Sequence, residues 1–107
     1  MSNIWVLKRS REFNSLMELS KMKTVIIKYT ASWCGPCRKI NPKFIEFSND
    51  YPDLQFAEID IDKFSKISNE QFIKSIPTFL VYLDNDMIDS LTGSNIYELE
   101  KLIKSHA

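Results

Sequence analysis

The stretch Tyr29–Lys39, YTASWCGPCRK, contains both cysteines of the 107-residue chain, Cys34 and Cys37. It joins a β-branched apolar segment, TVIIKYT at 24–30, to a segment of helical pattern that begins near Pro36. At a helix N-terminus, a cysteine is stabilised as a thiolate by unpaired backbone N–H groups and the positive end of the helix dipole. Cys34 is expected at such a terminus, and Cys37 follows within one helical turn. The stretch therefore predicts a strand-to-helix junction that carries a reactive dithiol.

Three other interpretations of the two cysteines are weaker. A disulfide that spans only two intervening residues closes a loop too short to restrain the unfolded chain much. A structural zinc site needs four ligands, and besides the cysteines the only histidine is His106, beside the last residue. Two cysteines that serve as small hydrophobes would be unusual at a strand-to-helix junction. We therefore expect a redox-active pair and no metal.

The composition narrows the class of protein. Lys plus Arg and Asp plus Glu are balanced at 14 each, so no overall field favours nucleic acid or an anionic membrane. The first 13 residues turn charged after a few positions, and no stretch reaches the roughly 20 apolar residues of a membrane span. We expect a single domain over residues 1–107 that is monomeric and cytoplasmic and binds neither nucleic acid nor membrane.

Apolar periodicity and turn residues predict alternating strands and helices. The expected strands are 4–7, 24–30, 54–62, 78–84 and 87–92, and the expected helices are 10–22, 36–49, 63–72 and 95–103. Ser10 and Asn95 are candidate N-caps, and Pro42 lies inside a helix that it should kink. The order β-α-β-α-β-α-β-β-α predicts an α/β fold with a central mixed sheet flanked by helices, because βαβ crossovers are parallel and a hairpin is antiparallel.

Several motifs together resemble one family. WCGPC at 33–37 is the active-site pentapeptide of thioredoxins, and the chain resembles this family over essentially its whole length. SIPTF at 75–79 is similar to the family's cis-proline loop, DID at 60–62 to the end of its third strand, and TGS at 92–94 to its glycine loop. The resemblance implies the thioredoxin fold for the predicted elements.

The resemblance also implies a reaction and its partners. Cys34 would attack a disulfide of a substrate protein, and Cys37 would resolve the mixed disulfide. Electrons would come from NADPH through a separate thioredoxin reductase, so the chain would act as a redox-active carrier. No bound cofactor is expected, because the sequence has no Gly-rich dinucleotide loop.

Residues on three loops would form the substrate-binding surface that the resemblance implies. They are Trp33, Gly35, Pro36, Ile76, Pro77 and Gly93. Pro77 would be a cis-proline that faces the dithiol, although the residues alone favour an ordinary proline at the start of a strand. Ile76 would offer backbone hydrogen bonds to an extended substrate segment, and Trp33, Ile76 and Gly93 would surround Cys34 with apolar surface.

Two positions depart from the family pattern. Lys28 stands six residues before Cys34, where the family usually has a buried aspartate, and Glu58 stands where it usually has a lysine. We predict an ion pair of reversed sign across adjacent strands, because a lone buried charge costs several kcal/mol. The alternative is that Lys28 extends along its aliphatic stem to the surface while Glu58 is solvated.

The exchange bears on proton transfer at the dithiol. A protonated lysine favours nearby thiolates and a carboxylate disfavours them, so Lys28 and Glu58 are expected to modulate the site. The proton of Cys37 would pass to Glu58, to a neutral fraction of Lys28 or to water, and we favour Glu58.

Two further functions stay open at this point. A disulfide oxidase or isomerase of the same superfamily would use the same cysteines, but those isomerases typically carry Gly-His where this chain has Gly35 and Pro36. A binding subunit with this fold would use the surface around Trp33, and its redox chemistry would be incidental.

Overall fold

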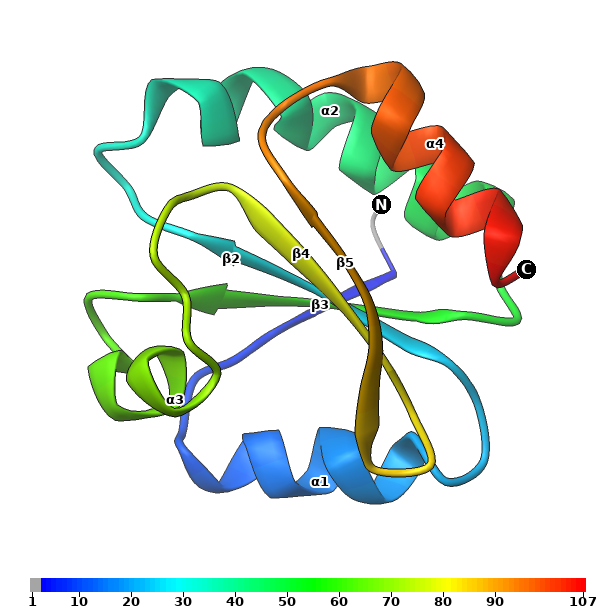
Figure 1. Cartoon of the computed structure of the whole chain (residues 1–107), viewed down its shortest axis with the longest axis horizontal. Helices are drawn as coiled ribbons and strands as arrows, with labels where there is room; N and C mark the ends of the chain where they lie inside the picture. The colour runs from blue at the N-terminus through cyan, green and yellow to red at the C-terminus, as the bar shows by residue number, and fades with distance from the viewer. Residues whose placement is uncertain (1–2) are drawn as a thin grey trace.

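A computed structural model of the chain describes residues 3–107, in which a five-stranded mixed sheet carries helices on both faces (Figure 1). The strands are β1 (Ile4–Val6), β2 (Val25–Thr30), β3 (Gln55–Asp60), β4 (Thr78–Leu83) and β5 (Asp86–Thr92). The helices are α1 (Arg11–Leu19), α2 (Gly35–Asp50), α3 (Ser65–Glu70) and α4 (Ile96–Ser105). The predicted element order and mixed sheet are confirmed.

The central strand is β2, as its apolar composition indicates. The sheet order is β1-β3-β2-β4-β5, with β2 parallel to β3 and antiparallel to β4. All residues of β2 from Val25 to Tyr29 are buried, including Lys28. The two parallel connections run through helices, and β4 and β5 form the predicted hairpin. The dithiol segment thus begins at the end of the central strand, which has a hydrogen-bonded neighbour on each side.

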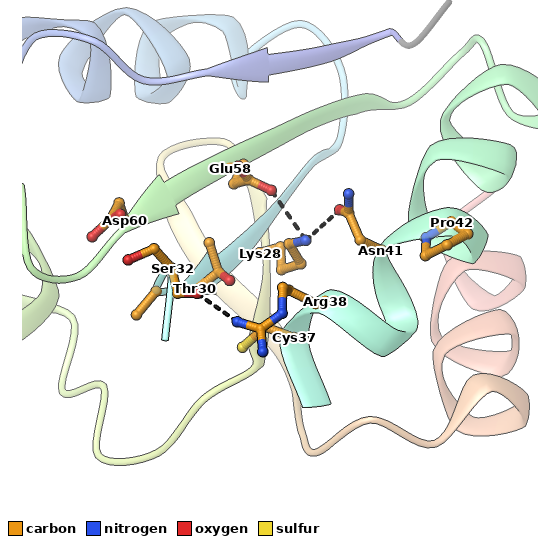
Figure 2. A pocket seen from close by; sticks show the side chains of 10 residues that line it. Lys28, Thr30, Ser32, Cys37, Arg38, Asn41, Pro42, Glu58 and Asp60 are labelled. Carbon is orange, nitrogen blue, oxygen red and sulfur yellow. Dashed lines mark hydrogen bonds and ion pairs between the residues drawn. The ribbon is translucent and has the colours of Figure 1, made fainter. Parts of the chain in front are cut away.

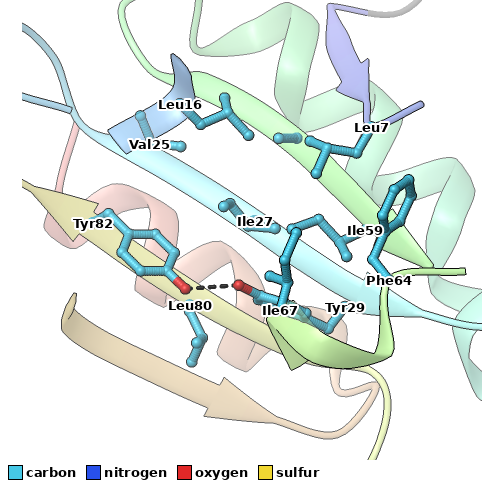
Figure 3. Close-up of a cluster of buried hydrophobic side chains, with 11 residues drawn as sticks. Leu7, Leu16, Val25, Ile27, Tyr29, Ile59, Phe64, Ile67, Leu80 and Tyr82 are labelled. Carbon is cyan, nitrogen blue, oxygen red and sulfur yellow. Dashed lines mark hydrogen bonds between the residues drawn. The ribbon is translucent and has the colours of Figure 1, made fainter. Parts of the chain in front are cut away.

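Alternation along β2 separates two cores. Ile27 and Tyr29 belong to the cluster covered by α1 and α3, whereas Ile26 belongs to the cluster covered by α2 and α4. In the first cluster the hydroxyls of Tyr29 and Tyr82 lie 2.7 Å apart (Figure 3), and burial raises the pKa of both phenols. Because side chains alternate across a strand, Lys28 falls on the same face as Ile26, toward α2.

Local details differ from the sequence prediction at several ends. Ser10 makes no side-chain cap, so that prediction is wrong: its own backbone is already helical. The Glu12 carboxylate accepts the backbone N–H groups of Lys8 and Arg9, just before the helix, at 2.7 and 2.6 Å. Asn95 does cap α4, because its side chain accepts the N–H of Glu98 at 3.0 Å.

Two shorter segments carry left-handed residues. The hairpin turns at Asp84 and Asn85, whose φ angles of 54° and 65° suit a type I′ turn, the type whose twist matches that of the two strands. The helix expected over 63–72 is shorter, at Ser65–Glu70, and Phe72 just after it has a φ of 59°. A bulky residue rarely adopts that conformation.

Candidate active site

The two cysteines sit where the strand-to-helix junction was predicted. Cys34 is the N-cap of α2, and its sulfur accepts the backbone N–H of Cys37 at 3.2 Å. A disulfide joins the two residues, with their Cα atoms 5.3 Å apart. Pro36 occupies the first turn of the helix, where a missing N–H removes no hydrogen bond. The chain is therefore in its oxidised form, with a backbone donor already directed at the Cys34 sulfur.

Both cysteines are largely shielded from solvent. Cys34 is 4% exposed and Cys37 is 1% exposed, and they cluster with Ala31. Ile61 and Ile76 pack against this cluster from other loops. Both sulfur-bearing side chains are thus buried at the junction of β2 and α2.

The proline and glycine loops meet beside the dithiol. The Ile76–Pro77 peptide bond is cis, as the family resemblance implied. The N–H of Gly93 donates to the carbonyl of Pro77 at 2.9 Å, and Gly93 has a φ of 112°, a conformation that L side chains rarely adopt. These contacts hold Ile76, Pro77 and Gly93 together as one rim of the site.

Trp33 forms the other rim. Its side chain is 65% exposed, and its indole N–H donates to Asp62 Oδ2 at 2.8 Å. Asp60 accepts the backbone N–H of Asp62 at 2.8 Å, which orders the loop that presents Asp62. Sequence reasoning marked the DID segment but assigned no partner to Trp33, because the contact between the two loops leaves no local signal in the sequence.

The predicted ion pair between Lys28 and Glu58 is present. The residues are register partners in β2 and β3, and Lys28 Nζ lies 3.0 Å from Glu58 Oε1. The Lys28 side chain is 2% exposed and that of Glu58 is 25% exposed. The alternative in which Lys28 extends to the surface is therefore wrong, because the ammonium is buried and paired.

A pocket of about 470 Å³ lies between this pair and Cys37 (Figure 2). Its walls come from β2, β3 and the first turns of α2, and include Lys28, Cys37, Arg38, Asn41 and Glu58. Sequence reasoning assigned no role to Arg38, whose guanidinium donates to the carbonyl of Ser32 at 2.6 Å.

Sequence reasoning missed Asn41 altogether. Its Oδ1 accepts a hydrogen bond from Lys28 Nζ at 2.5 Å. Asn41 follows Cys37 by four residues on α2, which places both on one helix face. That spacing was the one signal in the sequence that could have found it.

Neither a metal-binding cluster nor a membrane-spanning helix is present in the part of the chain that the structure describes. Within residues 3–107, no group of three or more His, Cys, Asp or Glu side chains is arranged to hold a metal ion. Over the same residues, every helix is too short or too polar to cross a membrane.

Comparison with known proteins identifies the family. The thioredoxin family model matches residues 4–105, and the chain belongs to the thioredoxin family. It is 43% identical to a thioredoxin of Coprinus comatus over 94% of this chain and 95% of that protein, and 38% identical to thioredoxin-1 of Schizosaccharomyces pombe over 91% and 92%. A wild-type thioredoxin h from poplar superposes with a TM-score of 0.91 at 37% identity, covering 96% of this chain and 95% of that one.

Fold and function follow from these findings together. The mixed sheet between two helical layers is the thioredoxin fold. Family membership and the bonded Cys34–Cys37 pair make the chain a thiol–disulfide oxidoreductase. The binding-subunit alternative is not favoured, because the redox-active pair is intact.

Proposed function

We propose that the chain reduces disulfides in substrate proteins, with Cys34 as the nucleophile and Cys37 as the resolving thiol. The Cys34 thiolate attacks one sulfur of the substrate disulfide, and the other sulfur leaves as a thiolate. Cys37 then attacks the Cys34 sulfur, which releases the second substrate thiolate. Two electrons pass to the substrate, and the Cys34–Cys37 disulfide forms.

One observation carries the assignment of the two roles. Cys34 caps α2 and its sulfur accepts the N–H of Cys37 at 3.2 Å, so the helix N-terminus stabilises negative charge on that sulfur. Cys37 is the more buried of the two, at 1% exposure, which suits a thiol that reacts only with its neighbour.

The rim residues form the proposed docking surface for the substrate. Trp33 is largely exposed, and Ile76 packs beside the dithiol next to Pro77. An extended substrate segment would lie along Ile76 and Gly93, with its disulfide over Cys34. Gly35 and Pro36 are exposed between the cysteines and complete this surface.

Glu58 is the proposed acceptor of the Cys37 proton. It lines the same pocket as Cys37 and is 25% exposed, so a water in that pocket can link the two. The positive charge of Lys28 influences this proton transfer from Cys37 to Glu58. Activity of Glu58→Gln that equals the wild-type value at neutral pH would remove Glu58 from this role.

A separate thioredoxin reductase is the proposed source of electrons, with NADPH as the donor. The proposed setting is the cytoplasm, where thiols are kept reduced. Turnover with NADPH, a thioredoxin reductase and insulin tests this electron-transfer cycle, because insulin chains precipitate once their disulfides are reduced. Absence of turnover with reductases from several sources would contradict this part of the proposal.

Trapping tests the roles of the two cysteines. Cys37→Ser should accumulate a covalent adduct with a disulfide-bonded protein, because the resolving attack is lost, and Cys34→Ser should form none. Adducts of equal yield from both variants would overturn the assignment. The reduction potential separates a reductant from an oxidase or isomerase, since about −270 mV is the value known for thioredoxin and about −180 mV that for disulfide isomerase.

A further inference from the structure

The buried ammonium of Lys28 is surrounded by three groups, and neither cysteine sulfur is among them. Glu58 Oε1 lies 3.0 Å from Nζ, and Asn41 Oδ1 accepts from it. The ring of Phe44 lies beneath it, with 5.3 Å from Nζ to the ring centroid. An ammonium has three N–H donors, so a carboxylate, an amide and an aromatic face account for its surroundings.

Two of these groups belong to the helix that begins at the dithiol. Cys37, Asn41 and Phe44 follow one another at helical spacing on α2, along one face. With about 1.5 Å of rise per residue, Asn41 lies roughly 6 Å and Phe44 roughly 10 Å beyond Cys37 along the helix axis. Figure 2 shows the tip of Lys28 directed at Glu58 and Asn41 rather than at Cys37. Two of the three groups that contact the ammonium thus lie on α2 beyond Cys37.

We infer that Asn41 is a positioning residue that anchors the Lys28 ammonium away from Cys37 and thereby limits its stabilisation of the reduced dithiol. This inference rests on the proposed reductase function. A cation closer to the thiols would favour their thiolates and make the pair more oxidising. Asn41 therefore keeps a chain with a buried lysine under its active site suited to reduction.

Of the three groups that contact the Lys28 ammonium, Asn41 can be substituted with the fewest other effects. Glu58 balances the charge of Lys28, and Phe44 is a core residue with no exposed surface, so changes to either have other consequences. Asn41 is only partly buried, and its side chain has no other hydrogen-bond partner within the described residues. The remaining charged groups on the pocket are Arg38, which binds the Ser32 carbonyl, and Asp60, which binds backbone N–H groups of its own loop.

The test is the equilibrium of the Cys34–Cys37 pair with reduced and oxidised glutathione, read from tryptophan fluorescence. Asn41→Leu removes the acceptor at similar volume and has a better helix propensity, so the variant should fold. We expect its equilibrium constant to shift about threefold or more toward the reduced dithiol. The pKa of Cys34 and Cys37, followed by thiolate absorbance, should fall as well. Asn41→Asp retains an acceptor for the ammonium and should not shift toward the reduced form.

A matched background shows whether the effect acts through Lys28. Asn41→Leu in a Lys28→Met chain should leave the equilibrium constant of Lys28→Met unchanged. An unchanged constant in the single Asn41→Leu variant, or a shift that persists without Lys28, would overturn the inference. Failure of the wild-type chain to reduce insulin would instead reject the proposed function, so the two failures are distinguishable.

Discussion

Removal of one partner from the Lys28–Glu58 pair should destabilise the fold asymmetrically. Glu58→Ala leaves an ammonium that is 2% exposed with only Asn41 as an acceptor, whereas Lys28→Met leaves a carboxylate that is 25% exposed and can hydrate through the pocket. Unpaired buried charges cost about 3–5 kcal/mol. We expect about 3 kcal/mol for Glu58→Ala and about 1 kcal/mol for Lys28→Met, because methionine also retains much of the lysine's volume.

The double variant measures the coupling. At a separation of 3.0 Å the Coulomb attraction is about 5.5 kcal/mol for an effective dielectric constant of 20, before any desolvation is subtracted. A net coupling of about 2 kcal/mol is therefore reasonable, and the double variant should lose about 2 kcal/mol rather than the 4 kcal/mol of additive losses.

Urea unfolding of the oxidised chain at pH 7 provides the free energies. Lys43 and Glu46 on α2 form a matched control pair, 3.1 Å apart but 45% and 54% exposed, and their coupling should stay below about 0.5 kcal/mol. Losses for Lys28→Met and Glu58→Ala that add within about 0.5 kcal/mol would refute the account of the pair.

Three smaller predictions concern other parts of the fold. Phe72→Asn should stabilise the chain by about 1 kcal/mol in urea unfolding, because Phe72 has a φ of 59° and is 80% exposed, so little apolar burial is lost; a loss of stability would show that the ring makes a needed contact. Burial raises the pKa of Tyr29 and Tyr82 above 10.0, so the stability that their neutral phenols contribute is full below pH 10 and declines as the pH rises above it. Ultraviolet absorbance should show both phenols ionising only when the chain unfolds, and ionisation of all tyrosines in the folded state would contradict this. The hydrogen bond from His106 lowers the pKa of Asp89 below its ordinary value of 3.8, so Asp89 stabilises the fold above that pH and ceases to do so as the pH falls through the lowered value. Because the carboxylate is 43% exposed, its advantage over Asp89→Asn should be under about 1 kcal/mol at pH 5 and should disappear once the carboxylate is protonated in the folded chain; a difference independent of pH would count against this.

Most of the fold was predictable because local pattern and tertiary packing agree. The β-branched segment of β2 is a central strand covered on both faces, and Asn95 begins a helix. The sequence prediction failed where the actual hydrogen-bond partner was a group that residue type alone did not indicate. Ser10 is a good N-cap by residue type, but its backbone is already helical, and the N–H groups of Glu12 and Phe13 donate to the carbonyls of Arg9 and Ser10. Residue type alone does not show which acceptor the first N–H groups of a helix bond to.

The site shows the same division between local and tertiary information. Register in a parallel pair of strands made the contact of Lys28 with Glu58 predictable from two departures from the family pattern. The third partner, Asn41, comes from α2, and its contact with Lys28 depends on how the helix lies over the sheet. Trp33 and Asp62 were likewise joined only by the packing of two loops.

The reversed pair also explains how the family's chemistry can tolerate a lysine beneath the dithiol. A lone buried cation would act on the thiols as a full charge, whereas Lys28 and Glu58, 3.0 Å apart, act at longer range as a dipole whose field falls more steeply with distance. The electrostatic potential at the thiols then depends on where the positive end of this dipole, the Lys28 ammonium, lies. Asn41 Oδ1 and the Phe44 ring, both on α2 beyond Cys37, lie against that positive end, and its effect on the redox equilibrium is what the Asn41→Leu variant measures.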